Sequence, residues 1–225
     1  MMRRYLLLIL LPTLLLSCLR EDPLVGPVTT EVTKGSRWNL RIGSTPEEVY
    51  ADLQVLGIEK SIHQVAVVGQ LPFATPQLLN NRLDLYDALS LQTTSGRSDR
   101  VLFQFADDTV SYVYAGGGML ESVSRWPEEV AEEAAIAAGN PISDIKRKLI
   151  DLYRSPDYAA YELVLSDKPL GRAYDPVMEH FSEWSFTFFE RVAPPYEDSY
   201  TVRLIFDNSR LDAIRVTQQR FETVH

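Results

Sequence analysis

Residues 42–49 read Ile-Gly-Ser-Thr-Pro-Glu-Glu-Val, and this short stretch carries the signals that begin a helix. Thr45 can accept a hydrogen bond from a free N–H group of the first turn, and Pro46 suits the first helical position because no hydrogen bond is lost there. Glu48 stands three residues after Thr45 and completes a capping box. The stretch therefore predicts a helix that begins at Pro46, and Gly57 can end it in a left-handed conformation.

A second stretch of the same kind follows 96 residues downstream, where Gly139 corresponds to Gly43. Asn140 and Pro141 repeat the capping residue and the proline. The apolar positions of the two helices also keep one register, with Val49, Leu53 and Leu56 corresponding to Ile145, Leu149 and Leu152. Residues at i, i+4 and i+7 lie on one face of a helix, so each stretch predicts a helix with one buried stripe.

A later pair of segments repeats a hairpin pattern. Residues 101–110 and 202–211 each hold a strand-like run that ends in Phe, a short Asp/Asn turn, and an apolar residue five positions after the Phe. Such a turn between apolar runs is typical of a β-hairpin. Coincidence is the alternative explanation, but two landmarks in the same order favour an internal duplication.

We therefore expect an α+β fold made of two tandem copies of a helix packed on an antiparallel four-stranded meander. Residues 38–126 would form the first α+β repeat. Residues 127–225 would form a connecting helix over 127–138, which is rich in Ala and Glu, and then the second α+β repeat.

The N-terminus has the pattern of an export signal. Two arginines precede an apolar run over residues 5–16, which is too short to span a bilayer. Leu15-Leu16-Ser17-Cys18 resembles a lipobox, the motif at which bacterial lipoproteins are lipidated and cleaved. We expect residues 1–17 to be a lipoprotein signal peptide and residues 18–37 to be the lipidated Cys18 and a flexible tether. The alternative is an ordinary secretory signal whose apolar run happens to contain a cysteine.

The charge balance and the cysteine content restrict the function further. The net charge is −9 at pH 7, and loss of Arg3 and Arg4 with residues 1–17 would make it −11. Such a surface repels nucleic acid, so we expect no nucleic-acid partner. Cys18 is the only cysteine, so the folded body can hold no disulfide and no thiolate metal cluster.

The unit that starts at Gly43 and continues through Leu53, Leu56 and Gly57 to a hairpin resembles the BamE/SmpA family of outer-membrane lipoproteins and the related β-lactamase-inhibitor-protein fold. The resemblance implies a non-enzymatic binding protein of the cell envelope, lipid-anchored and in the outer membrane, on either its periplasmic or its surface face. The chain departs from these families in three ways. Its units are longer, the second copy has Leu152-Tyr153-Arg154-Ser155 in place of the Leu-Gly helix ending, and the disulfides of the inhibitor proteins are impossible here.

Few residues point to catalysis. The sequence has three histidines, and none has a second His or Cys at metal-ligand spacing. No Gly-x-Ser-x-Gly motif is present. We therefore expect no enzyme activity, no cofactor and no metal. Glu179, His180 and Glu183 are the candidates for the alternative function, a small-molecule-binding or hydrolytic envelope protein with a pocket between the repeats.

Aromatic residues alternate in two predicted strands, which places each set on one sheet face. They are Tyr112 and Tyr114 in one strand, and Trp184, Phe186 and Phe188 in the other. Core packing is one explanation, and interface anchors on an exposed sheet are the other. The function favoured by the sequence is a membrane-anchored module that binds an envelope protein, as an assembly factor, scaffold or inhibitor.

Overall fold

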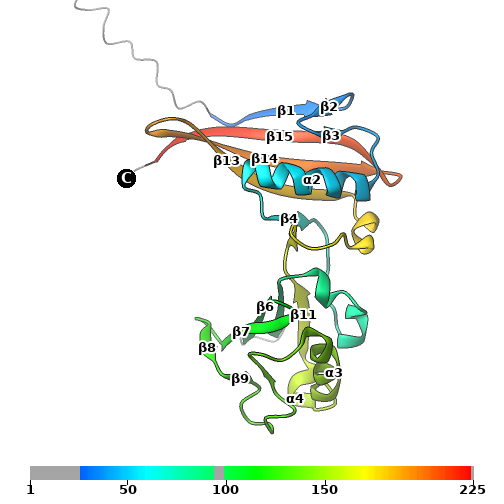
Figure 1. The fold of residues 1–225 in the computed structure, drawn as a ribbon, viewed down its shortest axis with the longest axis vertical. Coiled ribbons are helices and arrows are strands. Elements are labelled where there is room, and N and C mark those ends of the chain that lie inside the picture. Colours follow the sequence, from blue (N-terminus) through cyan, green and yellow to red (C-terminus); the bar gives the residue numbers. More distant parts are fainter. Residues whose placement is uncertain (1–25, 94–98, 224–225) are drawn as a thin grey trace, which may run out of the picture.

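The computed structural model describes residues 26–93 and 99–223. Two lobes lie one above the other and are joined by a narrow waist (Figure 1). The expected signal peptide and Cys18 lie outside the described residues. Strands dominate both lobes, and the described residues include three α-helices.

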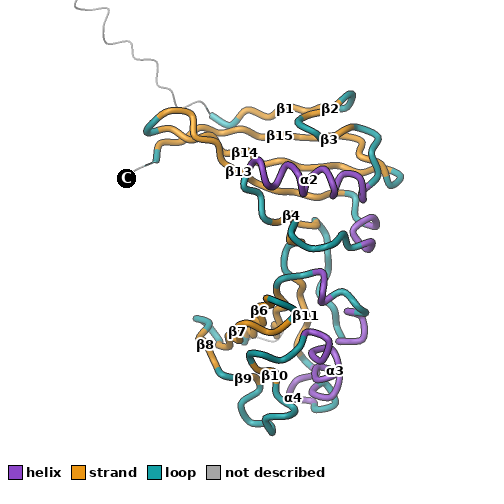
Figure 2. Tube along the Cα trace, in the orientation of Figure 1, coloured by secondary structure: helices purple, strands orange, loops and turns teal. Residues whose placement is uncertain are grey.

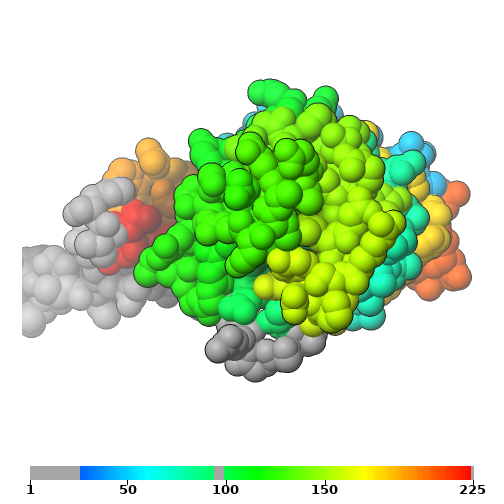
Figure 3. All heavy atoms as spheres, turned by 90° about the horizontal axis from the view of Figure 1, so that it is seen from below, coloured from blue at the N-terminus to red at the C-terminus, as the bar shows by residue number. Residues whose placement is uncertain are grey.

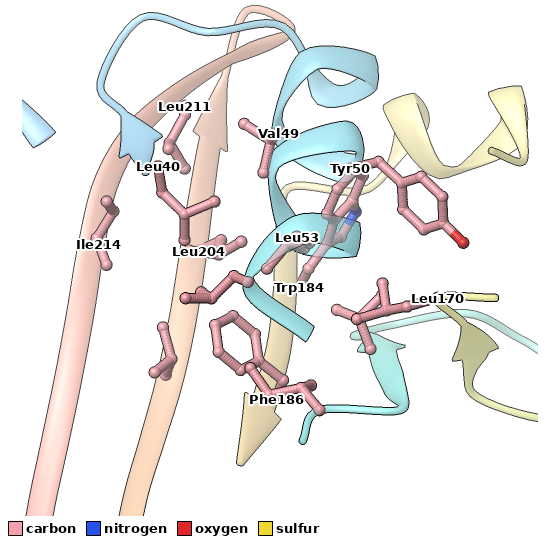
Figure 4. Close-up of a cluster of buried hydrophobic side chains, with 14 of the residues drawn as sticks. Leu40, Val49, Tyr50, Leu53, Leu170, Trp184, Phe186, Leu204, Leu211 and Ile214 are labelled. Atoms are coloured by element: carbon pink, nitrogen blue, oxygen red, sulfur yellow. The ribbon is translucent and has the colours of Figure 1, made fainter. Parts of the chain in front are cut away.

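The upper lobe is built on a six-stranded antiparallel sheet with the strand order β1-β15-β14-β13-β4-β12. Its strands are β1 (Val28–Val32), β4 (Gln64–Val67), β12 (Lys168–Pro169), β13 (Glu183–Ala193), β14 (Tyr196–Asp207) and β15 (Arg210–Glu222). Helix α2 (Pro46–Lys60) covers one face, and β2 (Ser36–Arg37) and β3 (Leu40–Arg41) form a small ribbon beside it. Side chains of α2 meet those of β13, β14 and β15 in the core (Figure 4).

The lower lobe is built on a five-stranded sheet with the order β11-β5-β6-β7-β8. Its strands are β5 (Ala88–Thr93), β6 (Arg100–Ala106), β7 (Thr109–Gly116), β8 (Glu121–Val123) and β11 (Tyr161–Leu165), with the small pair β9 (Arg125–Trp126) and β10 (Ile136–Ala137) beside them. Helix α3 (Ile142–Leu152) supplies buried residues to the core of this lobe. The remaining helical elements are α4 (Pro156–Ala159) and the 3-10 turns η2 (Pro76–Leu79), η3 (Leu83–Leu85) and η4 (Pro176–His180).

The expected α+β fold of two tandem helix-on-meander copies is wrong. Of the strands that follow it directly, helix α2 shares its core only with β4, and its apolar stripe lies mainly against β13, β14 and β15 from the C-terminal end. Helix α3 shares its core with β5, β6 and β7, which precede it, and with β11, which follows it. The two helices thus belong to different lobes, and each covers strands from the other half of the sequence (Figure 2). Residues from both ends of the chain build the upper lobe, and the middle of the chain builds the lower lobe.

The local signals of the first helix are mostly confirmed. Thr45 Oγ1 accepts from the Glu48 backbone N–H, and Glu48 Oε2 accepts from the Thr45 N–H at 2.8 Å. Gly57 does not end the helix, which continues to Lys60 and is capped by Ser61 in the left-handed region. A Cβ at Gly57 would lie 2.7 Å from the Ile62 carbonyl oxygen, so this glycine permits a close backbone approach.

Both predicted hairpins are present, as β6–β7 and β14–β15. The two turn residues of each hairpin have positive φ, between 48° and 59°. This conformation favours Asp and Asn and suits the right-handed twist of the strands. The helix expected over residues 127–138 is absent, because Ile136 pairs with Trp126 in a β-bridge and the segment between them runs as loop and turn.

Two further expectations about local structure need correction. Asn140 does not cap α3; the helix follows Pro141, and the Asn140 side chain instead accepts from Lys148 Nζ at 2.9 Å. The proposed tether over residues 18–37 is structured in part, because residues 28–32 form β1 and pair with β15.

Candidate functional site

Tyr112 and Tyr114 lie on the face of the lower sheet that is turned away from α3. Their neighbour Val113 points into the core with Phe103, so alternation along β7 places the tyrosines on the other side. Tyr112 is 55 % exposed, and the two rings stack with centroids 6.1 Å apart. The sequence prediction that these two side chains share a sheet face is thus met by the geometry.

A row that is apolar apart from Ser90 continues from Tyr114 across this face. Strand pairing places Leu102 opposite Tyr114, Ser90 opposite Leu102, and Val164 opposite Ser90. All four side chains are half-buried. We call Tyr112 together with this row the tyrosine face. Such a surface combines rigid aromatic side chains with flat apolar area, a composition enriched at protein interfaces.

The second aromatic set is placed differently. Trp184, Phe186 and Phe188 are at most 5 % exposed and lie in the core between the upper sheet and α2. The Trp184 indole N–H donates to the Met178 carbonyl at 3.3 Å, and its ring lies 4.6 Å from that of Phe206. These three residues therefore pack the core and present no surface to a partner.

The residues of the alternative pocket do not converge. Glu179 and His180 are exposed on η4. Glu183 begins β13 and binds the Arg203 guanidinium through two hydrogen bonds of 2.5 and 2.7 Å. This pairing lowers the pKa of Glu183, chiefly through the hydrogen bonds from Arg203.

A buried polar cluster at the waist was not foreseen from the sequence. Asp175 is 1 % exposed and accepts hydrogen bonds from Arg82 Nε at 2.8 Å and the Tyr86 hydroxyl at 2.7 Å. Lys168 is fully buried, and its Nζ donates to the Leu85 carbonyl at 2.8 Å. We call Arg82, Tyr86, Lys168 and Asp175 the waist joint. It ties residues 82–86 of the lower lobe to residues 168–175, which lead into the upper sheet.

Helix α2 of the upper lobe also holds this segment. The Tyr50 hydroxyl donates to the carbonyls of Pro169 and Arg172, at 2.7 and 3.0 Å. The Lys168 ammonium lies 5.2 Å from the Tyr50 ring centroid and 5.4 Å from that of Tyr86. A cation between one aromatic ring from each lobe contributes to holding the lobes in one orientation.

Two open hollows flank the waist. One has a volume of about 540 Å³ and is lined by residues that include Gln104, Ser111 and Arg172. Gln104 pairs directly with Tyr112, so this hollow borders the tyrosine face. The other has a volume of about 500 Å³ and shares Gln64 and Asp167 with the first. The first hollow is thus a depression beside the tyrosines, and the second approaches it at Gln64 and Asp167.

The waist joint predicts an unusual pH dependence of stability. Burial lowers the pKa of Lys168 to about 8, although Asp175 and Asp87 act in the opposite direction. Between pH 8 and the ordinary lysine pKa the unfolded chain binds more protons than the folded chain, so stability should rise with pH. Above about pH 10 the trend reverses, because burial raises the pKa values of Tyr50 and Tyr86 and unfolding then releases protons.

Urea unfolding between pH 7.5 and 9.5 tests whether stability rises with pH in this window. The free energy of unfolding should increase by at most about 1.4 kcal/mol per pH unit within that window. The variant Lys168→Met, which removes the titrating group but keeps an unbranched apolar chain, should give a flatter profile. Equal slopes for both proteins would contradict the assignment to Lys168.

Comparison with protein-family models, with curated proteins and with solved structures found no match. Among the described residues, no group of three or more His, Cys, Asp or Glu side chains is arranged to hold a metal ion. None of the helices described here has the length and apolar character needed to cross a bilayer.

Proposed function

We propose that this protein is a lipid-anchored, non-enzymatic module of the bacterial envelope that binds another envelope protein through the tyrosine face. The observation that carries the proposal is the stacked pair of Tyr112 and Tyr114 beside Leu102 and Val164, on a sheet face that α3 leaves uncovered. Stacked tyrosines offer contact area at a small cost in conformational entropy, because each has only two side-chain torsions.

The surroundings of the tyrosines support binding of a folded partner rather than of a small ligand. The depression at the waist is open to solvent and continues from Gln104 beside Tyr112. Its lining is mixed, with Asp87, Asp107, Asp167 and Arg172 around it. A polar depression beside an aromatic patch matches the usual arrangement of a polar rim around apolar anchors.

The proposed lipid anchor at Cys18 is compatible with a binding face on the lower lobe. Cys18 precedes the first residue of β1, Val28, by ten positions, and ten extended residues span at most about 35 Å. The tether would enter the upper lobe, whereas the tyrosine face belongs to the lower lobe (Figure 1). A lipid at Cys18 would thus hold one lobe near the membrane and leave the binding face free.

Photo-crosslinking from position 112 tests the proposal. The full chain would carry a photoreactive phenylalanine in place of Tyr112, and the matched control would carry it in place of Ile58, which is 87 % exposed on α2 of the upper lobe. Irradiation of native membranes should give a discrete crosslinked species from position 112 and not from position 58. Absence of any product from position 112, or the same products from both positions, would contradict binding through the tyrosine face.

A further inference from the structure

Strand β13 is paired along its whole length on one side but only in part on the other. Strand β14 pairs with it from Glu183 to Ala193, whereas β4 pairs with it only at Trp184 and Ser185. In the described ranges, no strand pairs with this second side from Thr187 to Arg191. The hairpin of β13 and β14, with the end of β15, also projects beyond the lower lobe in the space-filling view (Figure 3).

The backbone groups of this segment point outward. The Val68 N–H donates to the Glu183 carbonyl at 3.0 Å, which shows that the polar groups of Glu183 face β4. In an antiparallel sheet the N–H and C=O of one residue point to the same side, and every second residue repeats that direction. Thr187, Phe189 and Arg191 therefore direct their N–H and C=O groups to the free edge.

The side chains do little to protect this edge. Natural edge strands are commonly guarded by charged side chains, by proline or by bulges. Here Glu190 is matched by Lys60 at 2.5 Å and Arg191 by Glu197 at 3.8 Å, both within the same chain. The first irregularity in the pairing of β13 with β14 comes after Arg191, where the register shifts. Phe189 is 59 % exposed and contacts Phe221 edge to face, with ring centroids 6.0 Å apart.

We propose that a second copy of this chain pairs with this edge, with β13 antiparallel to its counterpart and Phe189 at the two-fold axis. Thr187 would then lie opposite the partner's Arg191, and Phe189 opposite the partner's Phe189. The residues whose polar groups face the edge are the same on both chains, so this register makes about six backbone hydrogen bonds.

The chemistry of the segment favours a copy of itself over another strand. The register brings the Phe189 ring, which is 59 % exposed, against the Phe189 ring of the partner, which covers exposed apolar surface of both chains. No unmatched charge on the segment opposes the approach, although the whole chain is acidic. Strand β4 at Ser185 and the irregularity after Arg191 limit the pairing to this segment, and a two-fold contact of this kind closes as a dimer.

Disulfide trapping in the full chain tests the pairing. The Cys18→Ala background removes the native thiol, so the test does not depend on the proposed lipid anchor. Phe189→Cys in this background should form a disulfide-linked dimer under a mild oxidant, which accepts two electrons and two protons from the two thiols. The Cα atoms at the axis would be about 5.5 Å apart, within the range that a disulfide spans.

Thr201→Cys is the matched control, because Thr201 is exposed on the same sheet face but lies one strand inward, opposite Thr187. The two copies of residue 201 would be separated by at least three strand spacings, about 14 Å, so no disulfide should form. By sedimentation equilibrium, Phe189→Lys should weaken the dimer of the Cys18→Ala chain at least tenfold. A monomer at all concentrations, equal trapping at positions 189 and 201, or trapping of a different protein at position 189 would overturn the proposal.

Discussion

Replacing Asp175 with alanine is expected to lower the free energy of unfolding by about 3–5 kcal/mol. The carboxylate is the counter-charge of Arg82, whose side chain is only 9 % exposed, and it also accepts from the Tyr86 hydroxyl. Removing it leaves a buried guanidinium without a counter-charge, and only the Tyr86 hydroxyl still accepts a hydrogen bond from it. Asp175 Oδ1 further accepts from the Val177 N–H at 3.1 Å, so the start of η4 would lose its cap.

A double variant separates the net contribution of the ion pair to stability from the free-energy cost of leaving one of its charges unpaired. Arg82→Met combined with Asp175→Leu removes both charges and keeps apolar volume, and such replacements are often close to neutral. Urea unfolding should show that the double variant recovers most of the stability that Asp175→Ala loses. A loss below about 1 kcal/mol in the single variant would mean that the waist joint does not hold the lobes together.

Trp184→Ala is expected to lower the free energy of unfolding by a similar amount, about 3–5 kcal/mol. Its ring is fully buried between α2 and the upper sheet, and the cavity left by alanine would lie among Tyr174 and Phe206. Tyr112→Ala is the matched aromatic truncation at an exposed position, and it should cost less than about 1 kcal/mol.

Together, Trp184→Ala and Tyr112→Ala distinguish a core role from a binding role. If Trp184 served mainly as a binding residue, its truncation would leave the unfolding midpoint nearly unchanged while weakening partner capture. We expect the reverse, with the unfolding midpoint lowered for Trp184→Ala and capture of the partner from native membranes reduced for Tyr112→Ala.

Local features of this fold could be predicted from the sequence because their causes are local. The capping box at Thr45 and the hairpin turns with positive φ depend on residues within a few positions of one another. The packing of α2 on strands that begin more than 120 residues after the helix has no such local cause. An apolar stripe such as that of Val49 and Leu53 specifies that a helix face is buried, and not which sheet buries it. Because α2 packs mainly on strands from the other half of the chain, the predicted tandem arrangement is wrong.

The candidate site shows the same limit. Alternation along a strand correctly grouped Tyr112 with Tyr114 and Trp184 with Phe186, but it does not say which group faces a helix. The position of α2 and α3 decides that, and it buries the second group. The waist joint had no local signal apart from Asp175 before Pro176, since Arg82 and Asp175 are 93 residues apart.

The proposal of a lipid-anchored binding protein is tested most directly by the intact mass and membrane fractionation of the native protein beside Cys18→Ala. We predict that the wild-type chain begins at Cys18, carries acyl mass on that residue and sediments with membranes, and that the variant is unacylated and released. A wild-type chain that is unacylated and soluble would contradict the anchor and with it the placement of this protein on a membrane.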